Sequence, residues 1–197
     1  MLASIHPLGE RARGNRFGVT AAVHIVGSAV GGALVGAAAG GVGTLIAAVV
    51  PRAAMVVTAA ALVAGALVLE ATGRAGRLPY WHRQVDEHWL DEYRGWVYGL
   101  GYGVQLGAGV VTIVSTATVY AMLVLAAAAS VAGGTIVGLT FGTIRGASVL
   151  LVHRVDSPAR LVAFHRSFQR LERVGRRLAV SSLGLSVAGL VVAAVAA

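Results

Sequence analysis

The apolar stretch 96–120 carries a row of polar side chains that could line a path or bind a solute. The row consists of Tyr98, Gln105, Thr112, Thr116 and Tyr120. Counted from Tyr98, the others follow at offsets of 7, 14, 18 and 22 residues, which places all five within about 40° on a helix. Amide and hydroxyl groups in hydrocarbon need partners, so the row should face protein or a water-filled path. The alternative is local hydrogen bonding, with the tyrosines at the two membrane boundaries.

Three ionisable side chains also lie inside apolar stretches, where their cost makes each a functional hypothesis. His24 lies in the first stretch and is either a proton carrier or a hydrogen-bonded structural histidine. Glu70 lies near the end of the second stretch. Its expected partner is Arg74, four residues on, and the alternative is a pair with Arg145 between helices, which would gate a cytoplasmic mouth.

Glycines recur every four residues in two of the apolar stretches. They are Gly95, Gly99, Gly103 and Gly107 in one stretch, and Gly134, Gly138, Gly142 and Gly146 in the other. Similar spacings occur in the first stretch, at Gly27, Gly31, Gly32, Gly36 and Gly40. Small residues at this spacing let helix backbones approach closely, which replaces the hydrophobic drive that lipid cannot provide. The glycines therefore predict tight helix packing.

Five apolar stretches are long enough to hold these groups inside a bilayer. They cover residues 17–50, 53–71, 96–120, 126–152 and 178–197. About 20 apolar residues cross the hydrocarbon core, and the chain of 197 residues is 57% apolar and only 12% charged. The sequence therefore predicts one all-α membrane domain over 1–197, a polytopic bundle of five transmembrane helices. Six spans are the alternative, with the first stretch broken near Gly40.

The positive charge of the chain predicts the orientation of this bundle. All sixteen basic residues are arginines, and most lie before the first stretch, between the second and third, or between the fourth and fifth. Arginines near span ends are retained in the cytoplasm. With five spans these three segments share one side, and only Arg52 lies on the other. We expect a multi-pass protein of the plasma membrane, the inner membrane of a bacterium, with a cytoplasmic N-terminus and an external C-terminus.

Two charged segments are predicted to be amphipathic helices at the cytoplasmic surface, at 79–95 and 157–177. The apolar face of the first has Val85, Trp89 and Tyr93, and that of the second has Leu161, Phe164, Phe168 and Leu171. Arginines around these faces suit a bilayer with an anionic cytoplasmic leaflet. The acidic and histidine side chains of 79–95 are interpreted as charge partners and not as a metal site. Without a base-reading motif, no nucleic-acid partner is expected.

The sequence leaves two function classes open. Without cysteine, thiol redox chemistry is excluded, and without a recognisable catalytic constellation we expect neither an enzyme nor a cofactor. The first hypothesis is a transporter or exporter of a small solute or ion. Its pathway candidates are Tyr98, Gln105, Thr112, Thr116, Tyr120, Glu70, Arg145 and His24. The alternative is a non-catalytic accessory or assembly subunit with glycine ridges as docking faces. Either is expected to form a homo-oligomer or to join other membrane subunits.

Overall fold

The described part of the chain is entirely helical, as predicted. The computed structural model describes residues 5–78, 92–109 and 117–195, and these contain no strand. The α-helices are α1 (Pro7–Ala12), α2 (Phe17–Ala47), α3 (Arg52–Ala71), α5 (Gly95–Ala108), α6 (Thr118–Ala128), α7 (Val131–Ala147) and α8 (Pro158–Val195). Two short 3₁₀ helices complete them, η1 (Ala75–Arg77) and η2 (Ser148–Val152).

Four helical segments are long and apolar enough to cross a membrane. They are Phe17–Ala47, Arg52–Ala71, Val131–Val152 and Arg173–Val195. They indicate a multi-pass membrane protein, with four candidate spans in the described residues where five were predicted.

The first apolar stretch forms one continuous helix. α2 runs unbroken through Gly40, Gly41 and Gly43, so the break required for six spans is absent. With 31 residues and a rise of about 1.5 Å per residue, α2 is about 46 Å long. It exceeds a hydrocarbon core of about 30 Å and must tilt or protrude.

The third and fourth predicted spans have the wrong boundaries. Residues 96–120 do not form one helix, because α5 ends at Ala108 and α6 begins at Thr118. Gly109 follows α5 with a φ of +73°, a left-handed conformation that glycine adopts easily and that ends a helix. The fourth span begins at Val131 and not at 126, because the Ser130 hydroxyl accepts a hydrogen bond from the Gly133 amide (3.1 Å) and caps α7 there.

The last two predicted helices are one. The segment 157–177 and the span 178–197 were predicted as separate elements, but α8 continues from Pro158 to Val195 over 38 residues. Arginine and leucine dominate the junction around residue 177 and favour helix, and the polarity change there does not interrupt the helix. Most of the other predicted interfacial helix, residues 79–91, lies outside the described residues.

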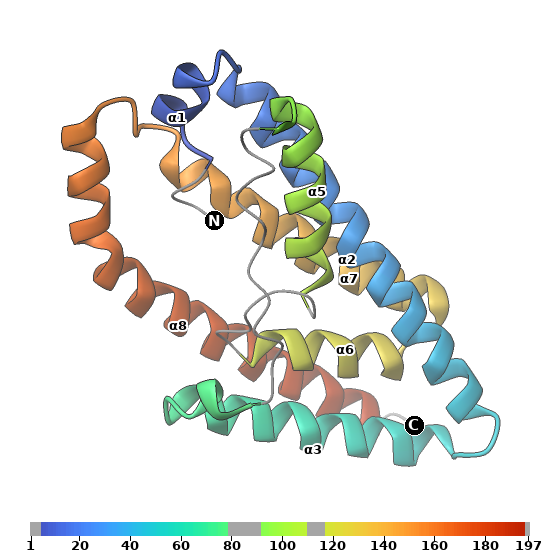
Figure 1. The fold of residues 1–197 in the computed structure, drawn as a ribbon. Helices are drawn as coiled ribbons and strands as arrows, with labels where there is room; N and C mark the ends of the chain where they lie inside the picture. Colours follow the sequence, from blue (N-terminus) through green and yellow to red (C-terminus); the bar gives the residue numbers. More distant parts are fainter. Residues whose placement is uncertain (1–4, 79–91, 110–116, 196–197) are drawn as a thin grey trace.

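The helices form two groups joined by α6 (Figure 1). In the first group, α2 packs along both α5 and α7. In the second group, α3 packs against α8. α6 contacts α2, α7 and α3. The second group has an ordinary side-chain core, made by Val63, Ala66, Ala75, Ala117, Ala121 and Leu183.

The first group is packed through its backbones. A Cβ atom added to Gly32 would overlap the carbonyl oxygen of Gly138, and one added to Gly36 would overlap that of Gly134. The same holds between α2 and α5, where a Cβ atom on Gly31 would overlap the carbonyl oxygen of Val104. At these positions there is no space for a side chain between the helices.

This packing predicts different effects for two glycines of the same helix. Gly36→Ala places a methyl group against the backbone of α7, whereas a methyl group on Gly41 has no described atom within 4 Å. Both substitutions bring the same gain in helix propensity. We expect Gly36→Ala to lower the free energy of unfolding by about 1 to 3 kcal/mol and Gly41→Ala to leave it equal or higher. Denaturant titration of the purified protein in detergent, followed by circular dichroism, measures both. Equal effects would contradict backbone packing at Gly36.

Candidate functional site

The short helix α1 closes one end of the α2–α5 interface. His6 caps α1, because its Nδ1 accepts a hydrogen bond from the Gly9 amide (3.1 Å), and Pro7 occupies the first turn, where no amide donor is needed. The Leu8 amide donates to the carbonyl oxygen of Val155 (3.1 Å). α1 is thereby tied to the chain that follows η2.

Glu10 on α1 is fully buried, and its carboxylate accepts hydrogen bonds from three side chains. The Tyr98 hydroxyl lies 2.5 and 2.6 Å from the two oxygens, and the Thr20 hydroxyl donates at 2.7 Å. The Arg13 guanidinium forms an ion pair at 2.6 Å. Asn15 adds a hydrogen bond from its amide to the Tyr98 hydroxyl (3.2 Å). A buried carboxylate requires partners of this number and kind.

Arg13 supplies the positive charge of this cluster. Its guanidinium carbon lies 5.7 Å from the centre of the Tyr98 ring, within the range of a cation–π contact. Burial lowers the pKa of Arg13, but its hydrogen bonds to Glu10 and Tyr98 outweigh burial, and the pKa is raised above its ordinary value. Arg13 therefore stays charged at every physiological pH.

Polar side chains continue from this cluster along α2. Thr20, His24 and Ser28 follow one another at intervals of four residues and are 1%, 4% and 0% exposed. The Ser28 hydroxyl donates to the carbonyl oxygen of Gly103 on α5 (3.0 Å). We call Glu10, Tyr98, Thr20, His24 and Ser28 the buried polar row.

His24 is the unusual member of the row. Its ring is hydrogen-bonded to the backbone of Gly99. Its Nδ1 is buried and has no hydrogen-bond partner among the residues that the structure describes. An unsatisfied buried nitrogen in a native protein calls for an explanation.

The row ends at Ser28. Further along α2, Gly32 and Gly36 meet the backbone of α7, so the interface there is closed at the level of the backbone. The buried polar row therefore begins at one end of the helices and stops inside them.

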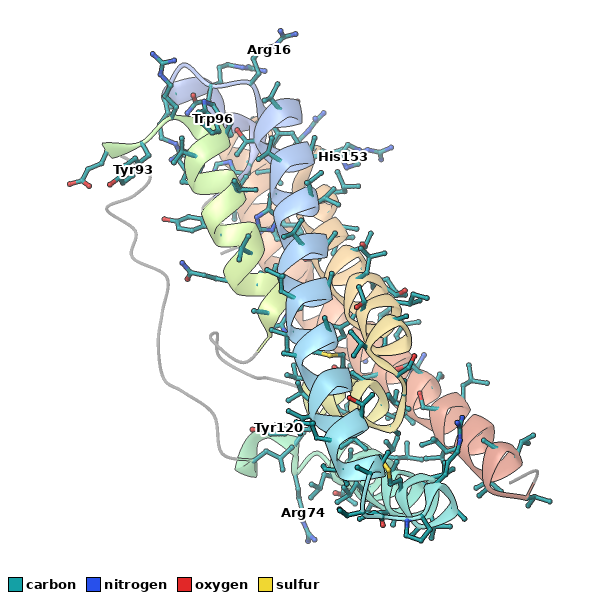
Figure 2. All side chains as sticks on the ribbon, turned by 90° about the vertical axis from the view of Figure 1, so that its right-hand side faces the viewer. Arg16, Arg74, Tyr93, Trp96, Tyr120 and His153 are labelled. Carbon is teal, nitrogen blue, oxygen red and sulfur yellow. The ribbon has the colours of Figure 1, made fainter. Side chains whose placement is uncertain are left out.

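The described members of the predicted polar face of residues 96–120 lie on two helices and not on one. Tyr98 belongs to the buried polar row, and Gln105 is half-buried on α5. Thr112 and Thr116 lie outside the described residues. Tyr120 is on α6 and lies in the half of the molecule that carries Arg74, away from Trp96 (Figure 2).

Glu70 lies apart from this row and has neither of the two partners proposed from the sequence. In the part of the chain that the structure describes, it forms no ion pair with Arg74 or Arg145. Its carboxylate accepts from the Ala117 amide (2.8 Å) at the start of α6, where the helix dipole favours an anion. The Glu70 carbonyl oxygen accepts from Nε of Arg176 (3.1 Å). Arg145 is half-buried, with its guanidinium carbon 5.7 Å from the centre of the Phe141 ring.

All eight glycines of the two predicted ridges face α2. A Cβ atom on any of Gly95, Gly99, Gly103, Gly107, Gly134, Gly138, Gly142 and Gly146 would come within 3 Å of an atom of the segment 15–36. The ridges are therefore used inside the chain, and they are not free docking faces for another subunit.

Sequence reasoning missed Glu10, Thr20 and Ser28. Glu10 had a signal, because it is the only acidic residue before the first span and stands among arginines. Thr20 and Ser28 lie four residues before and after His24. This helical spacing would have predicted that the three side chains share one face of the helix.

The fold and this cluster define an all-α, multi-pass membrane protein with a buried carboxylate at one end. Comparisons with protein-family models, curated proteins and solved structures find no match to the chain.

The cluster around Glu10 predicts that substitution of this residue lowers the stability of the protein. Glu10→Gln keeps the size of the side chain but removes the charge that Arg13 pairs with, and it weakens the bonds from Tyr98 and Thr20. We expect the free energy of unfolding to fall by about 2 kcal/mol. Glu92, an exposed acid, supplies the matched control Glu92→Gln, which should have almost no effect. A loss in the Glu10 variant no larger than in this control would rule out the cluster as a stabilising contact.

Proposed function

We propose that this protein transports a small solute or ion across the membrane and that protonation of His24 is coupled to transport. One observation carries the proposal: His24 is buried inside a span, and its Nδ1 has no hydrogen-bond partner within the described ranges of the chain. Imidazole gains and loses a proton near neutral pH, and a buried ionisable group in a span is costly unless it has a function.

The cluster around Glu10 supports a role as the closed gate of such a path. It lies at the end of the α2–α5 interface, directly before His24 in the buried polar row. Opening would require α1 to release Glu10 from Tyr98 and Thr20, which are contributed by α5 and α2. α5 is a helix of only 14 residues that ends at Ala108, so it can separate from α2 without moving a complete span. In this proposal the buried polar row takes the place of the path that was predicted along residues 96–120.

Proton movement is the direct test. The protein is reconstituted in vesicles that contain a pH-sensitive dye, and a potassium gradient with valinomycin imposes the membrane potential. We expect proton entry well above that of protein-free vesicles. His24→Gln, which keeps a polar side chain but cannot take up a proton, should reduce the rate at least about tenfold, the usual scale for loss of a proton-transfer group.

His153 is the matched control for this experiment. It is an exposed histidine beyond η2, and His153→Gln should leave the rate unchanged. If the wild-type rate equals that of empty vesicles, or if the two variants behave alike, the proposal is wrong.

An accessory subunit of a membrane complex is the second candidate, and α8 favours it. In the most apolar part of Arg173–Val195, only 6% is buried inside the molecule. The corresponding share in the other three candidate spans is 28% to 33%. Among the described residues, no atom lies within 4 Å of a Cβ atom added to Gly184 or Gly189. This helix is available to a partner. Stoichiometric co-purification of a second membrane protein, lost in Gly184→Leu, would support this candidate.

We also propose that the end of the molecule with Arg16, Trp96 and His153 is cytoplasmic (Figure 2). Arginines retained at that end favour it. Arg74 lies at the opposite end of the molecule in this view, although the five-span prediction gives Arg16 and Arg74 the same side. Only a tilt of the α3–α8 pair would reconcile the place of Arg74 in Figure 2 with the side that the five-span prediction gives it.

Labelling of single cysteines tests this orientation, because the chain has none of its own. In right-side-out vesicles, an impermeant maleimide should react with Arg52→Cys and spare Ser157→Cys, and inverted vesicles should give the reverse. Thr72→Cys reports the end of α3: labelling like that of Arg52→Cys would agree with the place of Arg74 in Figure 2, and labelling like that of Ser157→Cys would agree with the five-span prediction. Labelling of Ser157→Cys from outside would overturn the orientation.

A further inference from the structure

A groove of about 630 Å³ opens between the chain that follows η2 and the first half of α8. Leu151, Val155, Ala163 and Phe164 supply apolar surface to it, and Arg154 and Arg160 supply charge. The groove belongs to neither the buried polar row nor the contacts of α8 with α3. The groove therefore combines an apolar surface with positive charge, and an anionic amphiphile needs both.

The groove lies where a membrane boundary is expected. Leu151 is in the last turn of the candidate span Val131–Val152, and Arg154 follows two residues after its end. Figure 2 shows His153 at the same end of the molecule as Trp96. Trp96 is an exposed aromatic residue, and such residues favour the headgroup level of a bilayer.

The Arg160 side chain is hydrogen-bonded to the backbone of Arg154 and to Asp156. Nη1 of Arg160 donates to the carbonyl oxygen of Arg154 (3.3 Å) and to the carboxylate of Asp156 (2.7 Å). All three side chains are exposed. Guanidinium groups match phosphate oxygens in geometry and charge, while Asp156 competes for the same donor.

We propose that this groove binds an anionic phospholipid. The phosphate lies between Arg154 and Arg160, and an acyl chain follows Leu151, Val155 and Phe164 toward the apolar part of the molecule. This is a discrete site with its own lining, distinct from the general attraction of arginines to an anionic leaflet. The apolar wall favours a lipid over a soluble phosphate, which would leave that wall in water.

Native mass spectrometry of the full chain in detergent tests the site with synthetic phosphatidylglycerol and phosphatidylcholine. We expect one phosphatidylglycerol to bind more tightly than phosphatidylcholine. Arg154→Gln and Arg160→Gln should each weaken phosphatidylglycerol about fivefold, since one arginine near a lipid surface contributes on that scale. Phe164→Ala should weaken both lipids, whereas Val162→Ala, on the same helix and exposed, should weaken neither.

Asp156→Asn gives the sharpest test, because it should strengthen binding. The substitution removes a negative charge and frees Nη1 of Arg160 for the phosphate. Arg52→Gln, in an exposed arginine at the start of α3, controls for net charge and should have no effect. Equal losses in Arg52→Gln and Arg154→Gln, or weaker binding in Asp156→Asn, would overturn the site. Displacement of the lipid by glycerol phosphate at equal concentration would show a soluble phosphate site and contradict the lipid.

Discussion

The contact of the α2 backbone with the backbones of α5 and α7 is the constraint on which the first helix group depends. Lipid offers no hydrophobic drive for helices to associate, so close approach and the dispersion contacts it brings must hold them. On α2, Gly27 and Gly31 meet α5, while Gly32 and Gly36 meet α7. One helix therefore serves two partners, with glycines on two adjacent faces. The second group, around Val63 and Leu183, is held by side chains instead.

Much of the fold was accessible from composition and periodicity. Apolar length predicted the helices, and glycine spacing identified residues that the structure places at helix contacts. The errors occurred where one residue's conformation decides an end. Gly109, at positive φ, ends a helix that hydropathy alone continues to residue 120, and Ser130 starts α7 later than hydropathy implies. Hydropathy also separated 157–177 from 178–197, because it registers the polarity change around Arg177 and not the unbroken backbone of α8.

The candidate site was predictable only in part, because its contacts join residues far apart in the chain. His24 and Tyr98 were selected as polar groups in apolar stretches, but nothing in the local pattern connects Tyr98 to Glu10, 88 residues away. Glu10 was missed because α1 is too short to carry a periodic signal. The partner of Glu70 was missed because it is a backbone amide, that of Ala117, which no side-chain pattern can indicate.

The glycine packing also explains why the members of the buried polar row beyond Glu10 and Tyr98, namely Thr20, His24 and Ser28, lie on α2. Where two backbones touch, the glycine helix contributes no side chains, so any polar group in the interface must come from the facing helix and must be small. Thr20 and Ser28 meet this condition, and Ser28 bonds directly to a glycine carbonyl oxygen. His24 is larger, and its ring is accommodated beside Gly99. The same glycines that bring α5 against α2 therefore create the space for a buried imidazole, so packing and any proton-linked function at His24 share one physical origin.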